Sequence, residues 1–112
     1  MEIIKKEQSQ KFINGNITAY EYPSENKSIN SGYVEIRGRY PAEGWICNQV
    51  CTELAFIIRG SAILTTQTES FSLKEMDQII INPNEKYFWN GDCDVLVPST
   101  PPWFPEQTKI EK

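Results

Sequence analysis

The alternation of hydrophobic and polar residues along this chain predicts short β-strands. In the range 33–39, Val34 and Ile36 share one face, while the charged residues between them and after them share the other. No window keeps apolar residues at helical spacing over three turns, so no helix is predicted. Strand-like runs occur at 16–22, 32–40, 45–50, 54–59, 62–66, 70–73, 78–81, 86–89 and 94–97.

Clusters of Gly, Pro, Asn and Asp separate these runs. Among the predicted turns are Gly60-Ser61 and Asn90-Gly91-Asp92. Many short strands with such punctuation are typical of a β-sandwich or a β-barrel. The runs 54–58 and 79–81 are apolar on both faces, which predicts central strands that are covered on both sides.

Composition limits the class of protein. A chain of 112 residues with 39% hydrophobic and 23% charged residues predicts a single globular domain over residues 1–112. The net charge of −4 and the absence of a basic patch argue against nucleic acid as a partner. The longest apolar run, 54–58, is too short to span a membrane. The N-terminus lacks signal-peptide features, and three cysteines form no disulfide framework, so a cytoplasmic protein with reduced thiols is expected.

Two segments carry a recognisable motif. Glu53 begins a strand-like run that ends at Gly60, and a second block covers 76–90. Together they resemble the two signature motifs of the cupin superfamily, small β-barrels that usually hold a metal with three histidines and one glutamate. The resemblance covers about residues 38–103. It implies an all-β, antiparallel jelly-roll β-barrel of six to ten strands, with its core at about 31–104, and a homodimer.

This chain departs from the cupin motifs at the metal site, because it contains no histidine. The resemblance places Glu53 at the family's glutamate and Tyr87 at its last histidine. One register puts Cys47 and Gln49 at the paired histidines, and the other puts Ile46 and Asn48 there. Amides and phenols are poor metal ligands beside imidazole, so no metal and no other cofactor is expected. If a metal were bound, its ligands would be Cys47, Gln49, Glu53 and Tyr87.

Two further departures concern the turns. Met76 and Asn84 occupy positions where the family has glycines. Asparagine tolerates a left-handed turn conformation, but methionine does so only under strain. The turn at Met76 is therefore expected to differ from that of the family.

Aromatic residues predict the walls of a binding pocket. Tyr87 and Trp89 are two apart and share one face of a strand, which is the inner face if Tyr87 points inward as the family's histidine does. Trp103 lies in a proline-rich segment, 98–107, which is expected to close the barrel mouth. The alternative is that the segment forms a polyproline ligand, but its Pro-x-x-Pro spacing is only a weak pattern for that. The predicted ligand pocket consists of Gln49, Cys51, Glu53, Tyr87, Trp89 and Trp103.

The first functional hypothesis is a barrel that binds a small organic molecule without a standard metal site, with Glu53 and Gln49 orienting the ligand. The alternative is an atypical cupin enzyme, a lyase, isomerase or oxygenase, that uses Glu53 as its catalytic group with or without a metal. Ser–His and Cys–His catalysis is excluded by the lack of histidine. A third hypothesis is a structural protein with a fully packed barrel, which predicts no cavity near Glu53.

Overall fold

The computed structural model describes residues 1–112 as one antiparallel sheet of nine strands with two short 3₁₀ turns. The strands are β1 (Gln10–Asn14), β2 (Ile17–Tyr22), β3 (Asn30–Tyr40), β4 (Trp45–Asn48), β5 (Thr52–Thr66), β6 (Ser70–Lys74), β7 (Gln78–Ile81), β8 (Tyr87–Thr100) and β9 (Thr108–Glu111). The 3₁₀ turns are η1 (Lys6–Gln8) and η2 (Pro105–Gln107). These two 3₁₀ segments are the only helical elements, and no helix has the length and apolar character needed to cross a membrane.

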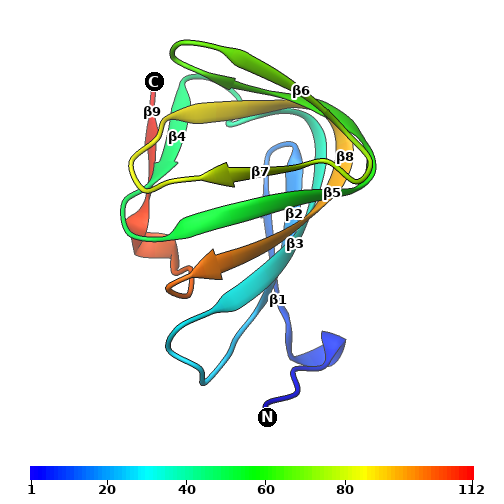
Figure 1. The fold of residues 1–112 in the computed structure, drawn as a ribbon, viewed down its shortest axis with the longest axis vertical. Coiled ribbons are helices and arrows are strands. Elements are labelled where there is room, and N and C mark those ends of the chain that lie inside the picture. Colours follow the sequence, from blue (N-terminus) through cyan, green and yellow to red (C-terminus); the bar gives the residue numbers. More distant parts are fainter.

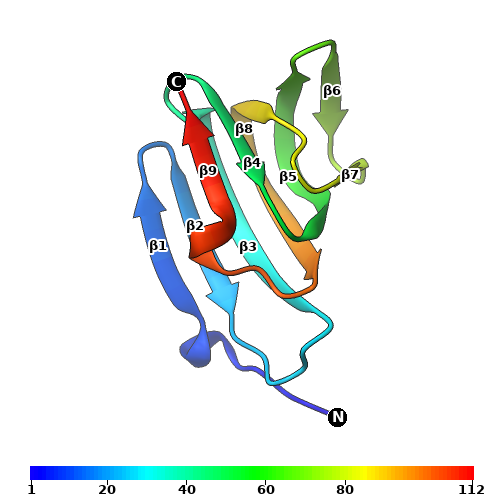
Figure 2. The ribbon, with the colours of Figure 1, turned by 90° about the vertical axis from the view of Figure 1, so that its left-hand side faces the viewer.

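The sheet curls into a barrel around the long strand β8. The main path runs β1-β2-β3-β8-β4-β9, and β5 pairs with β8 and also carries β6 and β7 (Figure 1). Figure 2 shows β4 and β9 in front of β3, so the sheet turns back over its own concave face. Every pairing is antiparallel. The prediction of an all-β antiparallel barrel of the cupin type is therefore confirmed.

Two predicted turns are instead bends within long strands. The runs 54–59 and 62–66 form the single strand β5, and the runs 86–89 and 94–97 form the single strand β8. Gly60 has a φ of +80°, and a Cβ there would collide with the carbonyl oxygen of Asp92. A Cβ on Gly91 would meet the backbone of β5 in the same way. These glycines allow two bent strands to approach each other closely. Glycine is used for such close contacts as well as for turns.

The turns at the two replaced family glycines keep the left-handed conformation. Asn84 has a φ of 66°, and Met76 has a φ of 74° with its side chain exposed to solvent. The expectation that the turn at Met76 would differ was wrong. Neighbouring backbone bonds hold this turn, because the Met76 amide donates to the carbonyl of Ile57 at 3.0 Å and the Asp77 amide donates to that of Lys74.

The sequence pattern missed the first and last strands. β1 is exposed along its whole length and pairs only with β2, while β9 pairs with β4. The sheet thus extends on both sides beyond the predicted core of 31–104. Both strands contribute residues to the barrel interior.

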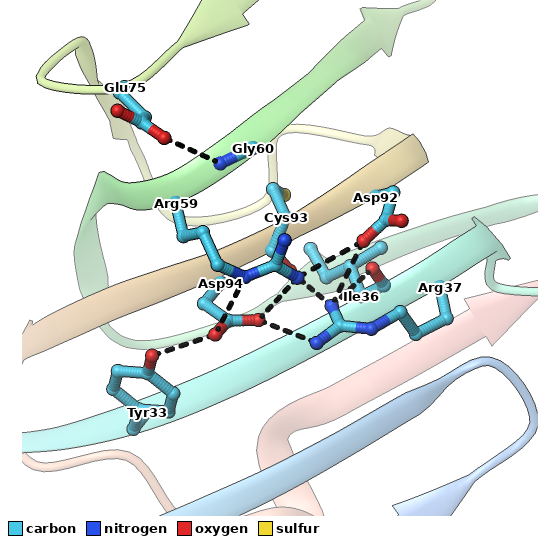
Figure 3. A network of polar contacts seen from close by, with 9 residues as sticks. All are labelled: Tyr33, Ile36, Arg37, Arg59, Gly60, Glu75, Asp92, Cys93 and Asp94. Carbon is cyan, nitrogen blue, oxygen red and sulfur yellow. Dashed lines mark hydrogen bonds and ion pairs between the residues drawn. The ribbon is translucent and has the colours of Figure 1, made fainter.

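A polar cluster joins β3, β5 and β8 on the outer face of the barrel (Figure 3). Asp94 accepts hydrogen bonds from Arg37 at 2.9 Å, from Tyr33 at 2.9 Å and from Arg59 at 3.4 Å, while Asp92 pairs with both arginines. Burial acts to raise the pKa of Asp94, but these bonds together hold it below its ordinary value. Each charged group in the cluster is paired, so we interpret it as a clamp across three strands.

Candidate functional site

The concave face of the sheet encloses a cavity of about 500 Å³. This volume and its mostly apolar walls are typical of a small-molecule site. A fully packed barrel, the third hypothesis, does not describe this interior. The lining residues are Phe12, Ile13, Asn14, Ile17, Ala19, Glu21, Val34, Ile36, Tyr40, Ile46, Asn48, Glu53, Tyr87, Trp89, Val95, Val97, Ser99, Trp103, Pro105, Thr108 and Ile110.

Four of the six predicted pocket residues line this cavity, namely Glu53, Tyr87, Trp89 and Trp103. The structure does not bring the other two to it. Gln49 is exposed, and Cys51 is buried outside the lining, where its amide donates to the side chain of Gln107 at 2.9 Å. The amide of Gln49 and the thiol of Cys51 are therefore not part of the cavity lining.

The register of β4 resolves the choice between the two placements of the family's histidine pair. Ile46 and Asn48 are buried and line the cavity, whereas Cys47 and Gln49 do not. Alternation along β4 turns Cys47 to the other face, and Gln49 lies just beyond the end of the strand with its side chain exposed. The register with Ile46 and Asn48 inward is therefore the one that the structure adopts.

The Glu53 carboxylate is held at the cavity wall by hydrogen bonds to both oxygens. Asn48 donates from Nδ2 to Oε1 at 2.7 Å, and Ser99 donates from Oγ to Oε2 at 3.3 Å. Burial raises the pKa of Glu53 above its ordinary value, and hydrogen bonds from Ser99, Tyr87 and Asn48 offset only part of that rise. Glu53 is thus a fixed carboxyl group that is tuned toward proton exchange nearer to neutral pH.

A chain of hydrogen bonds fixes the orientation of the Asn48 amide. Trp103 donates from Nε1 to Thr108 Oγ1 at 2.9 Å, and Thr108 donates to Asn48 Oδ1 at 2.7 Å. An indole nitrogen is only a donor, so the hydroxyl hydrogen of Thr108 is free for Asn48. The amide must then present its NH₂ group to Glu53. Trp103 consequently acts on the carboxylate through two intermediates as well as lining the cavity.

The aromatic walls come from opposite sides of the barrel. Tyr87 and Trp89 are buried side chains of β8, while Trp103 packs edge-on against Phe12 of β1 with ring centroids 6.1 Å apart. Burial, followed by the charge of Glu53, raises the pKa of the Tyr87 phenol well above its ordinary value. Tyr87 therefore stays a neutral hydrogen-bond donor at physiological pH.

Glu21 on β2 is a site residue that the sequence reasoning missed. It lines the cavity together with Ile17 and Ala19. Burial and the charge of Glu53 raise the pKa of its carboxyl to about 7. The signal was present in the sequence, because alternation places a glutamate at 21 on the same face as the apolar residues at 17 and 19.

The donor set of this cavity does not fit the metal of the cupin family. At the family's four ligand positions stand Ile46, which has no donor atom, Asn48, Glu53 and Tyr87. The oxygen of the Asn48 amide already accepts from Thr108, its nitrogen faces the carboxylate, and the phenol is protonated. No group of three or more His, Cys, Asp or Glu side chains converges anywhere in the structure. Of the four motif positions only Glu53 offers a carboxylate, and first-row metals in proteins need three or more converging donors.

Comparison with known proteins defines the class of fold. No family model matches the chain, and no curated protein matches it in sequence. Solved structures do match. Pac13, a Streptomyces nucleoside dehydratase, has a TM-score of 0.88 at 14% identity over 100% of this chain and 92% of the other. Ectoine synthase from P. lautus has a TM-score of 0.79 at 10% identity over 100% and 91%. The polyketide cyclase RemF from Streptomyces resistomycificus has a TM-score of 0.68 at 12% identity over 96% and 89%.

These matches are to cupin-like barrels, and they extend over nearly the whole of this chain and of each counterpart. The chain is therefore a small cupin-like barrel. At such low identities the likeness concerns the fold alone.

Proposed function

We propose that this protein is a metal-independent barrel that binds a small, uncharged organic molecule and transfers a proton to or from it with Glu53. The reaction class is that of a lyase or an isomerase. One observation carries this proposal: a half-buried carboxyl group with both oxygens hydrogen-bonded stands in the wall of an aromatic cavity. Carboxyl groups tuned in this way serve as general bases and acids.

The chemistry of the walls restricts the ligand. The lining contains the carboxyls of Glu21 and Glu53 but no lysine or arginine. An anionic ligand would face this negative charge with no cation in the lining to offset it. Aromatic side chains offer stacking surfaces, while Asn14, Tyr40 and Ser99 offer polar contacts around them. We therefore favour a neutral molecule with a flat or ring-shaped part and hydroxyl groups.

Enzymes on the same scaffold support a catalytic function over simple binding. The structurally similar proteins are named as a nucleoside dehydratase, an ectoine synthase and a polyketide cyclase, and variants of the first have been solved with uridine. A dehydratase needs a base for a C–H proton and an acid for a leaving hydroxyl, which carboxyl groups can supply. Glu53 can supply such a group in this cavity, and we therefore place the enzyme hypothesis ahead of the binding hypothesis.

The test is a screen for ligands followed by a test for turnover. Thermal shift with neutral nucleosides, including uridine, sugars and hydroxylated ring compounds would find binders, and mass spectrometry would then detect loss of water or isomerisation. The variant Glu53→Gln should lose turnover by about 10²-fold or more while still binding. Glu25→Gln, which removes an exposed carboxyl, is the matched control. Full turnover by Glu53→Gln would refute the proposal, and binding without turnover by the wild-type protein would favour a binding protein.

A further inference from the structure

The carboxyl group of Glu21 occupies a space that a glycine of the neighbouring strand leaves open. Glu21 on β2 lies opposite Gly32 on β3 in the sheet register. A Cβ on Gly32 would lie 2.9 Å from each carboxyl oxygen of Glu21, closer than real side chains approach. The absence of a side chain at residue 32 thus leaves the space in which the carboxyl group lies at the cavity wall.

The surroundings of Glu21 differ from those of Glu53. Asn48 and Ser99 donate hydrogen bonds to Glu53, which stabilises its ionised form. Only burial and the charge of Glu53 act on the Glu21 carboxyl, and no side-chain hydrogen bond offsets them. The other titratable groups that line the cavity are the phenols of Tyr40 and Tyr87, and burial raises the pKa of both. No cation therefore balances the two carboxyls.

Burial and a neighbouring like charge both disfavour the ionised form of a carboxyl group. The charge of Glu53 acts on Glu21 in addition to burial, and the pKa of Glu21 rises to about 7. Glu53 has hydrogen-bond donors that favour its carboxylate form and Glu21 has none, so Glu21 is the member of the pair that keeps a proton more readily.

We propose that Glu21 is the general acid that works with Glu53 as general base, and that the substrate is a neutral molecule with a hydroxyl group next to an acidic C–H bond. This inference rests on the proposed function. Glu53 takes the proton from carbon, and the C–H electron pair forms the C=C bond. The C–O bond breaks, and its electron pair leaves with oxygen, which takes the Glu21 proton and departs as water. Solvent then returns a proton from Glu53 to Glu21, so the cycle needs no oxidant or cofactor.

Two benzisoxazoles test both roles without knowledge of the natural substrate. A base removes the ring C–H proton of 1,2-benzisoxazole, the N–O bond breaks, and a nitrile and a phenolate form. The unsubstituted compound releases a basic phenolate and gains from an acid. The 5-nitro compound releases a stable phenolate and gains little. Both rings are small enough for a cavity of about 500 Å³.

Glu53→Gln should lower both rates by about 10²-fold or more, since it removes the base. Glu21→Gln should lower the rate with the unsubstituted compound about 10²-fold more than the rate with the nitro compound, since it removes the acid. The wild-type rate with the unsubstituted compound should rise as Glu53 loses its proton and fall as Glu21 loses its own. The falling limb should disappear in Glu21→Gln.

Gly32→Ala is a second variant that keeps the carboxyl but displaces it. It should change the ratio of the two rates in the same direction as Glu21→Gln, and it preserves the test if Glu21→Gln fails to fold. If these variants leave the ratio of the two rates unchanged while Glu53→Gln is inactive, the role of Glu21 is overturned and the role of Glu53 stands. Equal rates for Glu53→Gln and wild type, or no wild-type rate above that of buffer, would overturn the proposed function itself.

Discussion

The raised pKa of Glu21 has a consequence for folding stability that can be measured without any ligand. The pKa of Glu21 lies at about 7 in the folded protein and near its ordinary value of 4.5 in the unfolded chain. Between these values the folded state binds the proton more tightly. The contribution of Glu21 to the free energy of unfolding is therefore fully present below about pH 4.5 and is lost as the pH rises through about 7.

The size of this loss follows from the two pKa values. At about 1.4 kcal/mol per pH unit, the interval from 4.5 to about 7 corresponds to about 3 kcal/mol. Glu21 is not fully buried, and solvent screening reduces the figure to about 2 kcal/mol. In a domain of this size that is about 8 °C in Tm.

The assay compares wild type with Glu21→Gln by thermal unfolding from pH 4 to pH 8. Glutamine resembles the protonated carboxyl, so the two proteins should unfold at nearly the same temperature at pH 4. At pH 8 the variant should be more stable by about 2 kcal/mol. Glu25→Gln, which changes an exposed glutamate, should show no such divergence. A Tm difference between wild type and Glu21→Gln that stays constant from pH 4 to pH 8 would refute the reasoning.

Three other predictions concern stability and assembly. Met76→Gly should stabilise the fold by about 1 kcal/mol in urea, because glycine accepts the φ of 74° without strain; a destabilised variant would contradict this. Thr108→Val should lower the free energy of unfolding by about 2 kcal/mol in the same assay, because it leaves Trp103 Nε1 and Asn48 Oδ1 without their hydrogen-bond partner. Ile80 and Leu96 are 57% and 38% exposed on the outer face of the sheet, and the homodimer expected from the sequence would cover them. Leu96→Glu should then convert a dimer to a monomer in light scattering, and a wild-type monomer would remove the prediction.

The sequence was sufficient for the class of fold because alternation and turn residues are local signals. It failed where a residue has two uses. Gly60 and Gly91 were taken as turns, although they serve close contact between strands. β1 and β9 were missed since β1 lacks apolar burial and β9 depends on pairing with β4. Such pairing is a tertiary fact that local patterns do not contain.

The candidate site was predictable in part for a similar reason. Glu53 and Tyr87 stand within the motifs, and alternation then brought Trp89 with Tyr87. Gln49 was misplaced because a register slip of one residue moves every side chain of a strand to the other face. Glu21 lies outside the motifs, and only the curl of the sheet brings β2 to the same cavity as β5.

The loss of histidine changes the electrostatics of the barrel rather than emptying it of chemistry. In the cupin family a metal cation balances the charge of the glutamate at the position of Glu53. Here Ile46 and Asn48 remove the ligands of that cation, and no lysine or arginine of the lining replaces its charge. A second carboxyl, that of Glu21, makes the imbalance larger. The least costly remaining counter-charge is a proton, which the pair retains up to about pH 7. A cavity that holds an exchangeable proton on Glu21 beside Glu53, and no metal ligands at the motif positions, is suited to proton transfer.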